Sequence, residues 1–328
     1  MSESLIWHNG ALKPWHQATV HVSAHALHYG SSVFEGERVY ATHRGPAFFR
    51  LADHTRRLFD SARIYEIEIG YDEAQINAAC HAVVRANAMP SAYVRPIVFR
   101  GAGGLGVLPK DGAPVDVAIL ALDWGAYHGD AREHGADVCV SSWHRPAANT
   151  LPSWAKAGGN YLSSQLIAFE ARRGGYAEGI ALGVNGLLSE GAGENLFLVK
   201  QGRLYTPPTS AGVLAGITRD SVIALAADLG LTVEERELPR EALYTADEVF
   251  MTGTAAEITP VRSVDRKAVG TGQPGPVTRA LQRAFFGLFD GSTSDRWGWL
   301  EPVADGHDRA GRSAASAGRT DSSPALIP

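Results

Sequence analysis

Cysteine is scarce in this chain, and long apolar runs are absent from it. The 328 residues include only Cys80 and Cys139, too few for a disulfide framework, and both are expected to be small buried hydrophobes. No apolar run approaches the ~20 residues that a membrane-spanning helix needs. The opening "MSESLIWHNG" lacks the basic and then apolar order of a signal peptide. These absences predict a cytoplasmic protein without a membrane partner.

A strong excess of charge of either sign is also missing. The formal net charge is -5, which argues against nucleic acid or an anionic membrane as the main partner. An anionic substrate would therefore have to meet a local group of arginines. With 45% hydrophobic residues, a chain of this length can bury the core of one large domain or of two modest ones.

Hydrophobic patterning predicts strands and helices in the first half of the chain. Asn9-Gly10 is typical of a tight hairpin between "LIWH" and "ALKPW". Helices are expected over 51–64 and about 72–88, the first with Leu51, Leu58, Ala62 and Ile64 on one face. The runs "YVRPIVF" and "DVAILAL" indicate buried strands.

The second half alternates strands and helices more strongly. Strands are expected at "DVCVSSW" and "DEVFMTG", hairpins at Asn185-Gly186 and Gln201-Gly202, and helices at about 160–173, "ITRDSVIALAADLG" and "GPVTRALQRAFFGLF". Together these elements predict an α/β (α+β) fold of two domains. The expected divisions are a small domain at 1–122, a connection at 123–135, a large domain at 136–302 and a disordered tail at 303–328.

The stretch "SWAKAGGNYLSSQ" surrounds Lys156 with small residues, which a solvated lysine does not need. Gly158 and Gly159 permit a ligand to approach the backbone closely. Tyr161, five residues further on, can hydrogen-bond an oxygen beside the lysine nitrogen. A lysine that must react with the aldehyde of a flat, phosphorylated ring, such as pyridoxal 5'-phosphate, needs this setting.

Such a cofactor needs two further partners. A carboxylate must keep its ring nitrogen protonated, and "LLSEGAGENLFLV" offers Glu190, which we favour, or Glu194. Its phosphate needs donors, preferably at a helix N-terminus. Candidate donors are found in "LAGITRDS" and "MTGTAAE" and at one arginine: Gly216, Ile217, Thr218, Gly253, Thr254 and Arg57.

Seven motifs in this order resemble the branched-chain amino acid aminotransferases, which are class IV enzymes with the type IV fold of pyridoxal phosphate enzymes. The motifs are "LHYGSSVFEGERVY", "RRLFDSARIY", "YVRPIVF", "KAGGNYLSS", "NGLLSEGAGENLF", "PPTSAGVLAGITRDS" and "DEVFMTGTAAEITPV", and the resemblance spans roughly residues 4–302. It implies the two-domain fold of that family. It also implies amino transfer between leucine, isoleucine or valine and 2-oxoglutarate, with pyridoxal 5'-phosphate as cofactor.

The resemblance also implies site residues. Lys156 is similar to the lysine that bonds to the cofactor and moves a proton, Glu190 to the ring-nitrogen partner, and Tyr161 to the residue at the ring hydroxyl. Arg57, Ile217, Thr218 and Thr254 resemble the phosphate ligands, and Leu214 the residue packed on the ring. The substrate pocket matches Phe34, Gly36, Tyr93, Arg95, Trp124, Tyr127, Thr254 and Ala255, with Arg95 receiving the side-chain carboxylate of glutamate.

Tyr29 and Val107 match positions that a neighbouring subunit delivers, so a homodimer is the smallest expected assembly, and a trimer of dimers stays open. Glu37 departs from the family pattern, which has an apolar residue between Gly36 and Arg38. Facing inward, it would disturb a preference for aliphatic substrates, whereas strand alternation would turn it away from Gly36.

Two other kinds of activity fit parts of the sequence. Within the same fold, the chain could be a D-amino acid or amine aminotransferase, or a 4-amino-4-deoxychorismate lyase. A metal protein is the alternative of another class, because His21, His25 and His28 have the spacing of one helical face. No carboxylate or cysteine accompanies them, so they are interpreted as ordinary core or surface histidines and no metal site is expected.

Overall fold

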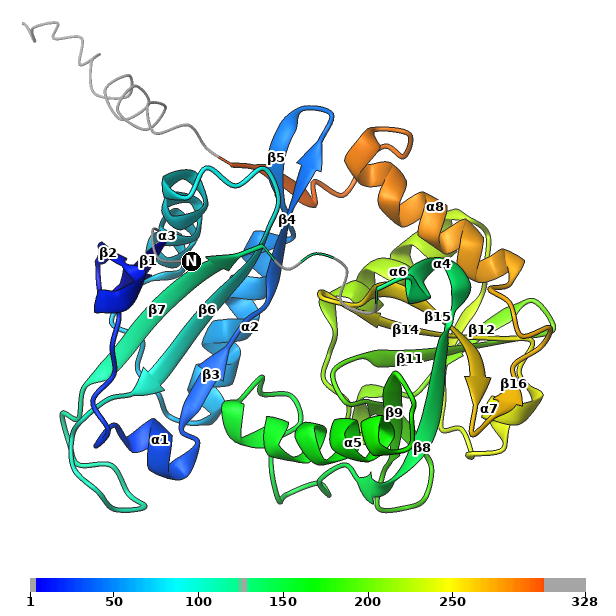
Figure 1. The fold of residues 1–328 in the computed structure, drawn as a ribbon, viewed down its shortest axis with the longest axis horizontal. Helices are drawn as coiled ribbons and strands as arrows, with labels where there is room; N and C mark the ends of the chain where they lie inside the picture. Colours follow the sequence, from blue (N-terminus) through cyan, green and yellow to red (C-terminus); the bar gives the residue numbers. More distant parts are fainter. Residues whose placement is uncertain (1–3, 124, 126–128, 304–328) are drawn as a thin grey trace, which may run out of the picture.

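The computed structural model describes residues 4–123, 125 and 129–303, and its strands form two sheets (Figure 1). The first sheet is antiparallel throughout and has the order β17-β5-β4-β6-β7-β1-β2, with β3 paired to β6. Its strands are β1 Leu5–His8, β2 Ala11–Pro14, β3 Ser32–Phe34, β4 Glu37–Thr42, β5 Gly45–Phe49, β6 Ala92–Arg100, β7 Val115–Leu122 and β17 Leu300–Pro302. Helices α2 Leu51–Ile64 and α3 Glu73–Ala86 pack on it, and α1 His25–Tyr29 lies beside β6.

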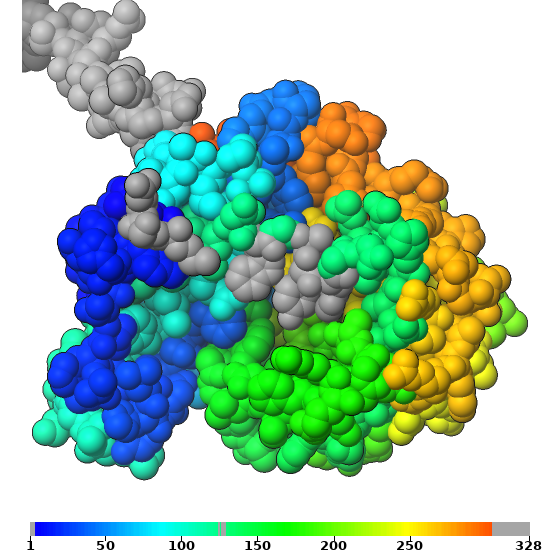
Figure 2. Space-filling view, viewed as in Figure 1, coloured from blue at the N-terminus to red at the C-terminus, as the bar shows by residue number. Residues whose placement is uncertain are grey.

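The second sheet mixes parallel and antiparallel pairs in the order β10-β9-β8-β15-β14-β11-β12-β13, with β16 paired to β15. Its strands are β8 Ala136–His144, β9 Glu178–Leu182, β10 Leu188–Gly191, β11 Asn195–Lys200, β12 Arg203–Thr206, β13 Val233–Glu235, β14 Glu248–Gly253, β15 Glu257–Val264 and β16 Lys267–Ala268. The helices of this half are α4 Ala131–His134, α5 Tyr161–Arg173, α6 Ile217–Asp228, α7 Ala242–Thr245 and α8 Pro276–Asp290. Figure 2 shows the two halves side by side, blue to cyan against green to orange.

Most of the predicted elements are confirmed, and so is the mixed fold class. Asn9 and Gly10 form the first hairpin turn with φ values of 50° and 92°, the positive values that such a turn requires. Gly230, at φ 71°, follows the end of α6 as expected. The placement of Ile64 on the buried face of α2 was wrong: it lies about 200° around the helix from Ala62 and is exposed.

Two features of the chain path were not anticipated from the sequence. The predicted connection contains the short helix α4 at Ala131–His134. The predicted second domain ran to residue 302, yet β17 pairs with β5 and so completes the first sheet. The predicted disordered tail lies outside the described residues, apart from Val303, whose N–H bonds the Pro46 carbonyl.

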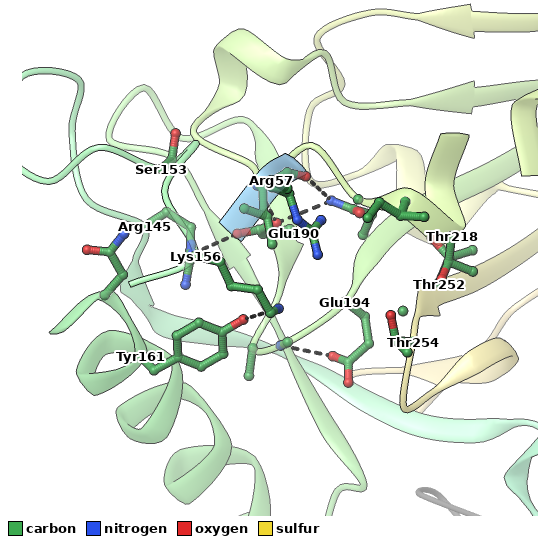
Figure 3. Close-up of a pocket in the computed structure, with 18 of the residues that line it drawn as sticks. Arg57, Arg145, Ser153, Lys156, Tyr161, Glu190, Glu194, Thr218, Thr252 and Thr254 are labelled. Atoms are coloured by element: carbon green, nitrogen blue, oxygen red, sulfur yellow. Dashed lines mark hydrogen bonds and ion pairs between the residues drawn. The ribbon is translucent and has the colours of Figure 1, made fainter. Parts of the chain in front are cut away.

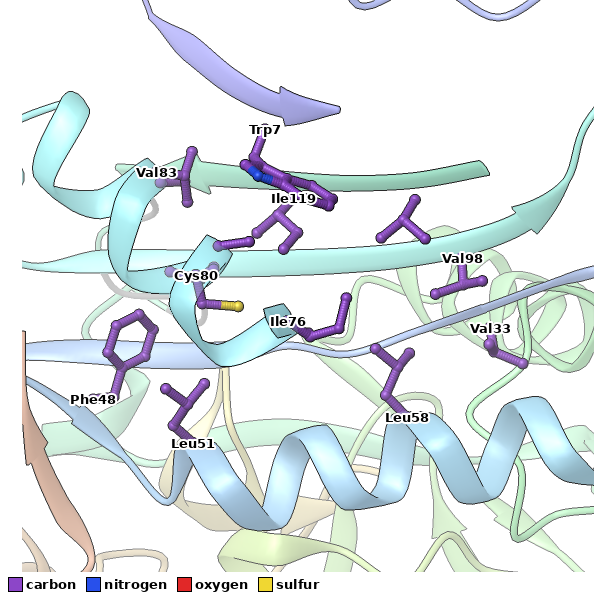
Figure 4. Packing of buried hydrophobic residues seen from close by; sticks show 14 of the residues in the cluster. Trp7, Val33, Phe48, Leu51, Leu58, Ile76, Cys80, Val83, Val98 and Ile119 are labelled. Carbon is purple, nitrogen blue, oxygen red and sulfur yellow. The ribbon is translucent and has the colours of Figure 1, made fainter. Parts of the chain in front are cut away.

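The core of the first half lies between its sheet and the helices α2 and α3. Figure 4 shows side chains from three layers meeting there, with Leu51 and Leu58 from α2, Cys80 from α3, and Val98 from β6. Periodicity at seven residues places Leu51 and Leu58 two turns apart on one face of α2. This packing fixes α2 against the sheet, which matters because the same helix also carries Arg57.

Glu37 is buried inside this apolar core. Its side chain has no exposed surface, and the weak thiol donor of Cys80 is the polar group beside it. Burial, and then the charge of Glu35, raise the pKa of Glu37 well above its usual value. Glu37 is therefore a neutral acid on the α3 side of the sheet, and strand alternation has turned it away from Gly36.

A buried neutral glutamate makes stability fall as the pH rises. The unfolded chain releases this proton near the ordinary value of 4.5, and the folded chain releases it at a higher pH, so between the two values each pH unit costs up to about 1.4 kcal/mol of unfolding free energy. Glu37→Gln removes the titration, and its gain in Tm over the parent is expected to grow from pH 5 to pH 8. Thermal unfolding across this range tests the prediction. A difference in Tm between variant and parent that stays the same at every pH would contradict it. Glu68→Gln is the control, because Glu68 is exposed.

Candidate active site

One pocket lies where the first half meets the second, and its empty space, the open mouth included, is about 570 Å³ (Figure 3). Helix α2 contributes Arg57 from the first half, while β10 and α6 contribute Glu190 and Ile217 from the second. Lys156 and all of the predicted cofactor residues line this pocket: Arg57, Tyr161, Glu190, Leu214, Gly216, Ile217, Thr218, Gly253 and Thr254. Residues up to 197 positions apart in sequence, Arg57 and Thr254, thus meet at one site (254 − 57 = 197).

Lys156 is held by its backbone, and its amine is directed by Tyr161. The lysine N–H donates to Ser61 Oγ at 3.0 Å, and its carbonyl accepts from the N–H of Phe34 at 3.0 Å. Nζ lies 2.9 Å from Tyr161 Oη (Figure 3). A Cβ at Gly158 would collide with the hydroxyl of Ser32, so glycine permits this close approach of the two halves. The amine is therefore fixed inside the pocket instead of moving freely in solvent.

Glu190 is a buried carboxylate with three donors around it. Oε1 lies 2.7 Å from Arg145 Nη2, and Oε2 accepts from the Leu214 N–H at 2.9 Å and from Asn195 Nδ2 at 3.3 Å. Burial raises the pKa of Glu190, while Arg145 and the Leu214 N–H act in the opposite direction. The ion pair with Arg145 keeps a fixed negative charge at the floor of the pocket.

Glu194, the other acid weighed for the same task, has a different setting. It also lines the pocket, and its Oε2 accepts from the Gly193 N–H at 3.0 Å. Burial, and then the charge of Glu194, raise the pKa of neighbouring Glu178 well above its usual value. Glu194 therefore lies beside a second buried acid, whereas Glu190 has a cationic partner. This difference favours Glu190 as the acid that faces a cationic ring nitrogen.

The opposite end of the pocket gathers donors for an anion. Helix α6 begins at Ile217 after Gly216 without any side-chain cap, so N–H groups of its first turn stay available at the pocket wall. A Cβ at Gly216 would collide with the amide of Asn195. Arg57 adds its guanidinium, and Thr252 adds a buried hydroxyl without a partner among the described residues. These groups fit a phosphate.

Beside Lys156 lies a group of aromatic residues with one arginine. The Arg95 guanidinium lies 4.5 Å from the Phe34 ring centre, and its Nη2 donates to Tyr93 Oη at 3.0 Å. A Cβ at Gly36 would collide with the Tyr93 hydroxyl. Phe34 also packs on Tyr161, with ring centres 4.9 Å apart. The structure thus joins Phe34, Gly36, Tyr93 and Arg95 to the lysine side of the pocket.

The comparisons with known proteins agree with this chemistry. Residues 32–264 match the family described as amino-transferase class IV. The branched-chain-amino-acid aminotransferase of Salmonella typhimurium is 58% identical over 299 residues, which cover 91% of this chain and 97% of that protein. The chain belongs to the branched-chain amino acid aminotransferases.

Solved structures of these aminotransferases have the same fold. A crystal structure of the Escherichia coli branched-chain amino acid aminotransferase is 57% identical, with a TM-score of 0.91, covering 92% of this chain and 100% of that one. The enzyme of Thermobaculum terrenum, solved in its PLP-form, is 35% identical, with a TM-score of 0.86, covering 93% of this chain and 99% of that one.

Some residues predicted for the aminotransferase site are not placed in this pocket. Trp124 and Tyr127 lie outside the described residues. Tyr29 and Val107 are 44% and 85% exposed and do not line it. They lie on neighbouring segments, because His25 of α1 reaches the Gly106 carbonyl at 2.8 Å through Nε2. Their assignment to a neighbouring subunit stays a prediction.

Several aminotransferase residues in or beside the pocket were missed. Arg145, Asn195 and Thr252 line it, and Glu35 pairs with Arg57. Arg145 stands in "WHRPAA" without a local pattern, but "FEGER" could have indicated Glu35 through its position beside the predicted Phe34 and Gly36.

No metal cluster or membrane span is found in the described part of this aminotransferase. Among residues 4–123, 125 and 129–303, no group of at least three histidine, cysteine or acidic side chains could hold a metal ion. In the same residues no helix has both the length and the apolar character needed to cross a membrane. Of the three spaced histidines, His25 and His28 belong to α1 while His21 precedes it.

Proposed function

We propose that this protein transfers amino groups between leucine, isoleucine or valine and 2-oxoglutarate, giving branched-chain 2-oxo acids and L-glutamate. The observation that carries the proposal is one pocket with Lys156 at its centre, the Glu190 carboxylate on its floor and an anion site at α6. The names of its similar relatives, branched-chain-amino-acid aminotransferases, support the choice of substrates.

Pyridoxal 5'-phosphate is the cofactor that these residues fit. When bound, it supplies an aldehyde that reacts with amines and a ring that withdraws electrons from the substrate carbon. Lys156 would hold the aldehyde carbon, Glu190 the ring nitrogen, Tyr161 the ring hydroxyl and Leu214 one face of the ring. Arg57, Ile217, Thr218 and Thr254 would hold the phosphate, with Gly216 and Gly253 giving room for its approach.

Lys156 is the residue that moves the proton in each half-reaction. Its Nζ would take the proton from the substrate Cα and deliver it to the neighbouring carbon of the cofactor, as general base and then general acid. Tyr161 keeps the amine directed at this position through the 2.9 Å hydrogen bond. Glu190, held by Arg145 at 2.7 Å, keeps the positive charge on the ring nitrogen stable.

One substrate pocket must accept both an aliphatic and an acidic side chain. Phe34, Gly36 and Tyr93 offer an apolar surface for leucine, and the predicted lining residues Thr254 and Ala255 lie at the turn after β14. A glutamate carboxylate would be costly to bury unpaired in the same place. Arg95 solves this, because it rests on the Phe34 and Tyr93 rings and its buried Nε has no partner among the described residues. Trp124 and Tyr127 remain predicted lining residues.

Arg95→Ala is therefore expected to separate the two substrates. Loss of a bidentate charged contact should lower kcat/KM for glutamate and 2-oxoglutarate by roughly 10² or more, with a much smaller change in the half-reaction with leucine. Single-turnover measurements of each half-reaction test this. Equal losses for both substrates would assign Arg95 a structural role. Arg100→Ala is the control, since Arg100 ends the same strand but bonds the carbonyls of Tyr65 and Glu66.

A panel of amino donors against 2-oxoglutarate tests the function as a whole. Leucine, isoleucine and valine are expected to be the best donors. Preference for D-amino acids or simple amines would favour the other aminotransferases of this fold, and release of 4-aminobenzoate would favour 4-amino-4-deoxychorismate lyase.

A homodimer is the assembly that the exposed surface supports. Apolar side chains are exposed on α1, on the segment 101–110 and on α5: Leu27, Tyr29, Leu105, Val107, Leu108, Leu162, Leu166 and Phe169. A Cβ at Gly30, just after α1, would lie 3.2 Å from Gly159, just before α5, so these segments adjoin. A second copy covering this face would bring Tyr29 and Val107 to the neighbouring pocket. A trimer of such dimers and the cytoplasmic location stay predictions.

A further inference from the structure

Glu35 is a fully buried acid at the point where the cofactor end and the substrate end of the site meet. Its side chain has no exposed surface, and its backbone N–H donates to the Pro96 carbonyl at 2.8 Å. In sequence it stands between Phe34, which packs on Tyr161, and Gly36, which makes room for Tyr93. An acid with no solvent is tolerated only where its lone pairs are satisfied, so its partners define its task.

Four donors surround the Glu35 carboxylate. Oε1 accepts from Arg57 Nε at 2.6 Å, and Oε2 accepts from Arg57 Nη2 at 2.8 Å, from His54 Nδ1 at 2.7 Å and from the Gly36 N–H at 3.2 Å. Three of these contacts end on Oε2 and one on Oε1, and the side chain has no exposed surface, so donors of this chain take the place of solvent around the acid. The contact with Arg57 is bidentate, which fixes the plane of the guanidinium as well as its position.

The same contacts decide which Arg57 donors face the pocket. A guanidinium has five N–H groups, and two of them go to Glu35. A third, on Nη1, donates to the Ala215 carbonyl at 2.9 Å. One N–H on Nη1 and one on Nη2 remain, and Arg57 lines the pocket beside the start of α6. Two such N–H groups can donate to the oxygens of a phosphate.

His54 supports the acid from the other side. It lies one turn before Arg57 on α2, has 1% of its surface exposed, and donates through Nδ1 because its partner is an acceptor. Burial lowers the pKa of His54, with the charge of Glu35 opposing the shift. Burial alone would raise the pKa of Glu35, but the charges of Arg57 and His54 hold it well below its usual value. The described contacts thus join a buried histidine, an anion and a cation.

We propose that Glu35 and His54 are positioning residues that direct two Arg57 N–H groups at the cofactor phosphate. Because Glu35 directly follows Phe34 in the chain, the same contacts couple the orientation of Arg57 to the position of Phe34. The inference rests on the proposed function, because it assumes a phosphorylated cofactor in this pocket. Neither residue lines the pocket itself: Glu35 acts through its contact with Arg57, and His54 acts through Glu35. Substitution of either residue should therefore weaken the binding of a phosphorylated ligand and leave the binding of an unphosphorylated ligand nearly unchanged.

The test is a titration of the full-length apoprotein with pyridoxal 5'-phosphate and, separately, with pyridoxal. Glu35→Gln is expected to weaken binding of pyridoxal 5'-phosphate by about 10- to 100-fold, the usual loss for a charge-assisted contact. Binding of pyridoxal should change less than about threefold, since its contacts do not include Arg57. His54→Gln should weaken phosphate-dependent binding in the same direction by about three- to tenfold. In an Arg57→Ala background, Glu35→Gln should have almost no further effect.

Glu301→Gln is the matched control. It breaks another carboxylate–histidine pair of the first half, with His81 Nε2 at 2.8 Å, away from the pocket. Both binding constants should stay at the parent values. Thermal unfolding of each apoprotein shows whether a variant has lost its fold. If Glu35→Gln does not fold, the binding constants of His54→Gln for the two ligands test the proposal.

Equal weakening for the two ligands, or unchanged binding of pyridoxal 5'-phosphate, would overturn the proposal, and so would failure of both variants to fold. A failure of the proposed function has another signature. In that case the parent protein itself would bind pyridoxal 5'-phosphate no better than pyridoxal, whatever residue stands at position 35.

Discussion

Lys156→Ala is expected to lower kcat/KM for leucine by about 10⁴ or more, because one change removes both the covalent anchor and the group that moves the proton. Among the described lining residues of the pocket, Lys156 carries the only side-chain amine. Its backbone bonds to Ser61 and Phe34 do not involve the side chain, so the fold and some cofactor binding should survive.

Two measurements accompany the rate. Borohydride reduction of the parent enzyme with its cofactor should label one peptide, the one that contains Lys156, and the variant should not be labelled. A label at Lys110 or Lys200 would refute the assignment. Lys200→Ala is the control for the loss of an amine, because Lys200 bonds Asp247 at 3.1 Å, outside the pocket, and this variant should keep its activity.

Glu190→Gln is expected to lower kcat by about 10²–10³, the usual cost of losing one preorganised electrostatic partner. A neutral amide cannot stabilise a positive charge on the ring nitrogen, so electrons leave the substrate carbon less readily. Arg145 also loses its anion in a buried place, so Tm should fall as well. Rates are therefore compared at a temperature where each variant is folded.

The neighbouring acid provides the control for Glu190. Glu194→Gln should lower kcat by less than about tenfold, because a change of charge beside Glu178 alters no contact with the ring nitrogen. Activity of Glu190→Gln within about twofold of the parent would show that Glu190 does not do this work. A larger loss of kcat in Glu194→Gln than in Glu190→Gln would show that Glu194 is the partner of the ring nitrogen.

What the sequence predicted well are features that depend on local backbone chemistry. Lys156 with its glycines, the Gly216 start of α6 and the Asn9-Gly10 turn all require special residues at fixed spacing, and all lie where they were expected. Leu51 and Leu58 followed from the helical period and are buried. Such signals lie within a few residues and need no knowledge of the distant chain.

What the sequence did not reveal are pairs of side chains brought together by the tertiary fold. Glu190 with Arg145 joins two elements 45 residues apart (190 − 145 = 45), and neither residue has a pattern that identifies the other. Glu35 with Arg57 is a similar case. Glu37 shows the opposite limit: its departure from an apolar pattern was visible in the sequence, which left two orientations open, and the structure shows the one that strand alternation favours, buried beside Cys80.

The return of β17 to the first sheet has a consequence for the order of folding. Leu300 pairs with Phe49, so 251 positions separate the two residues (300 − 49 = 251). During synthesis the first sheet lacks this edge strand until nearly the whole chain has left the ribosome, whereas each pairing within the second sheet is complete by residue 268. Closing so long a loop costs much conformational entropy before any contact between the two strands offsets it. We therefore expect the second half to become resistant to protease on nascent chains first, with the opening half following only when its last strand arrives.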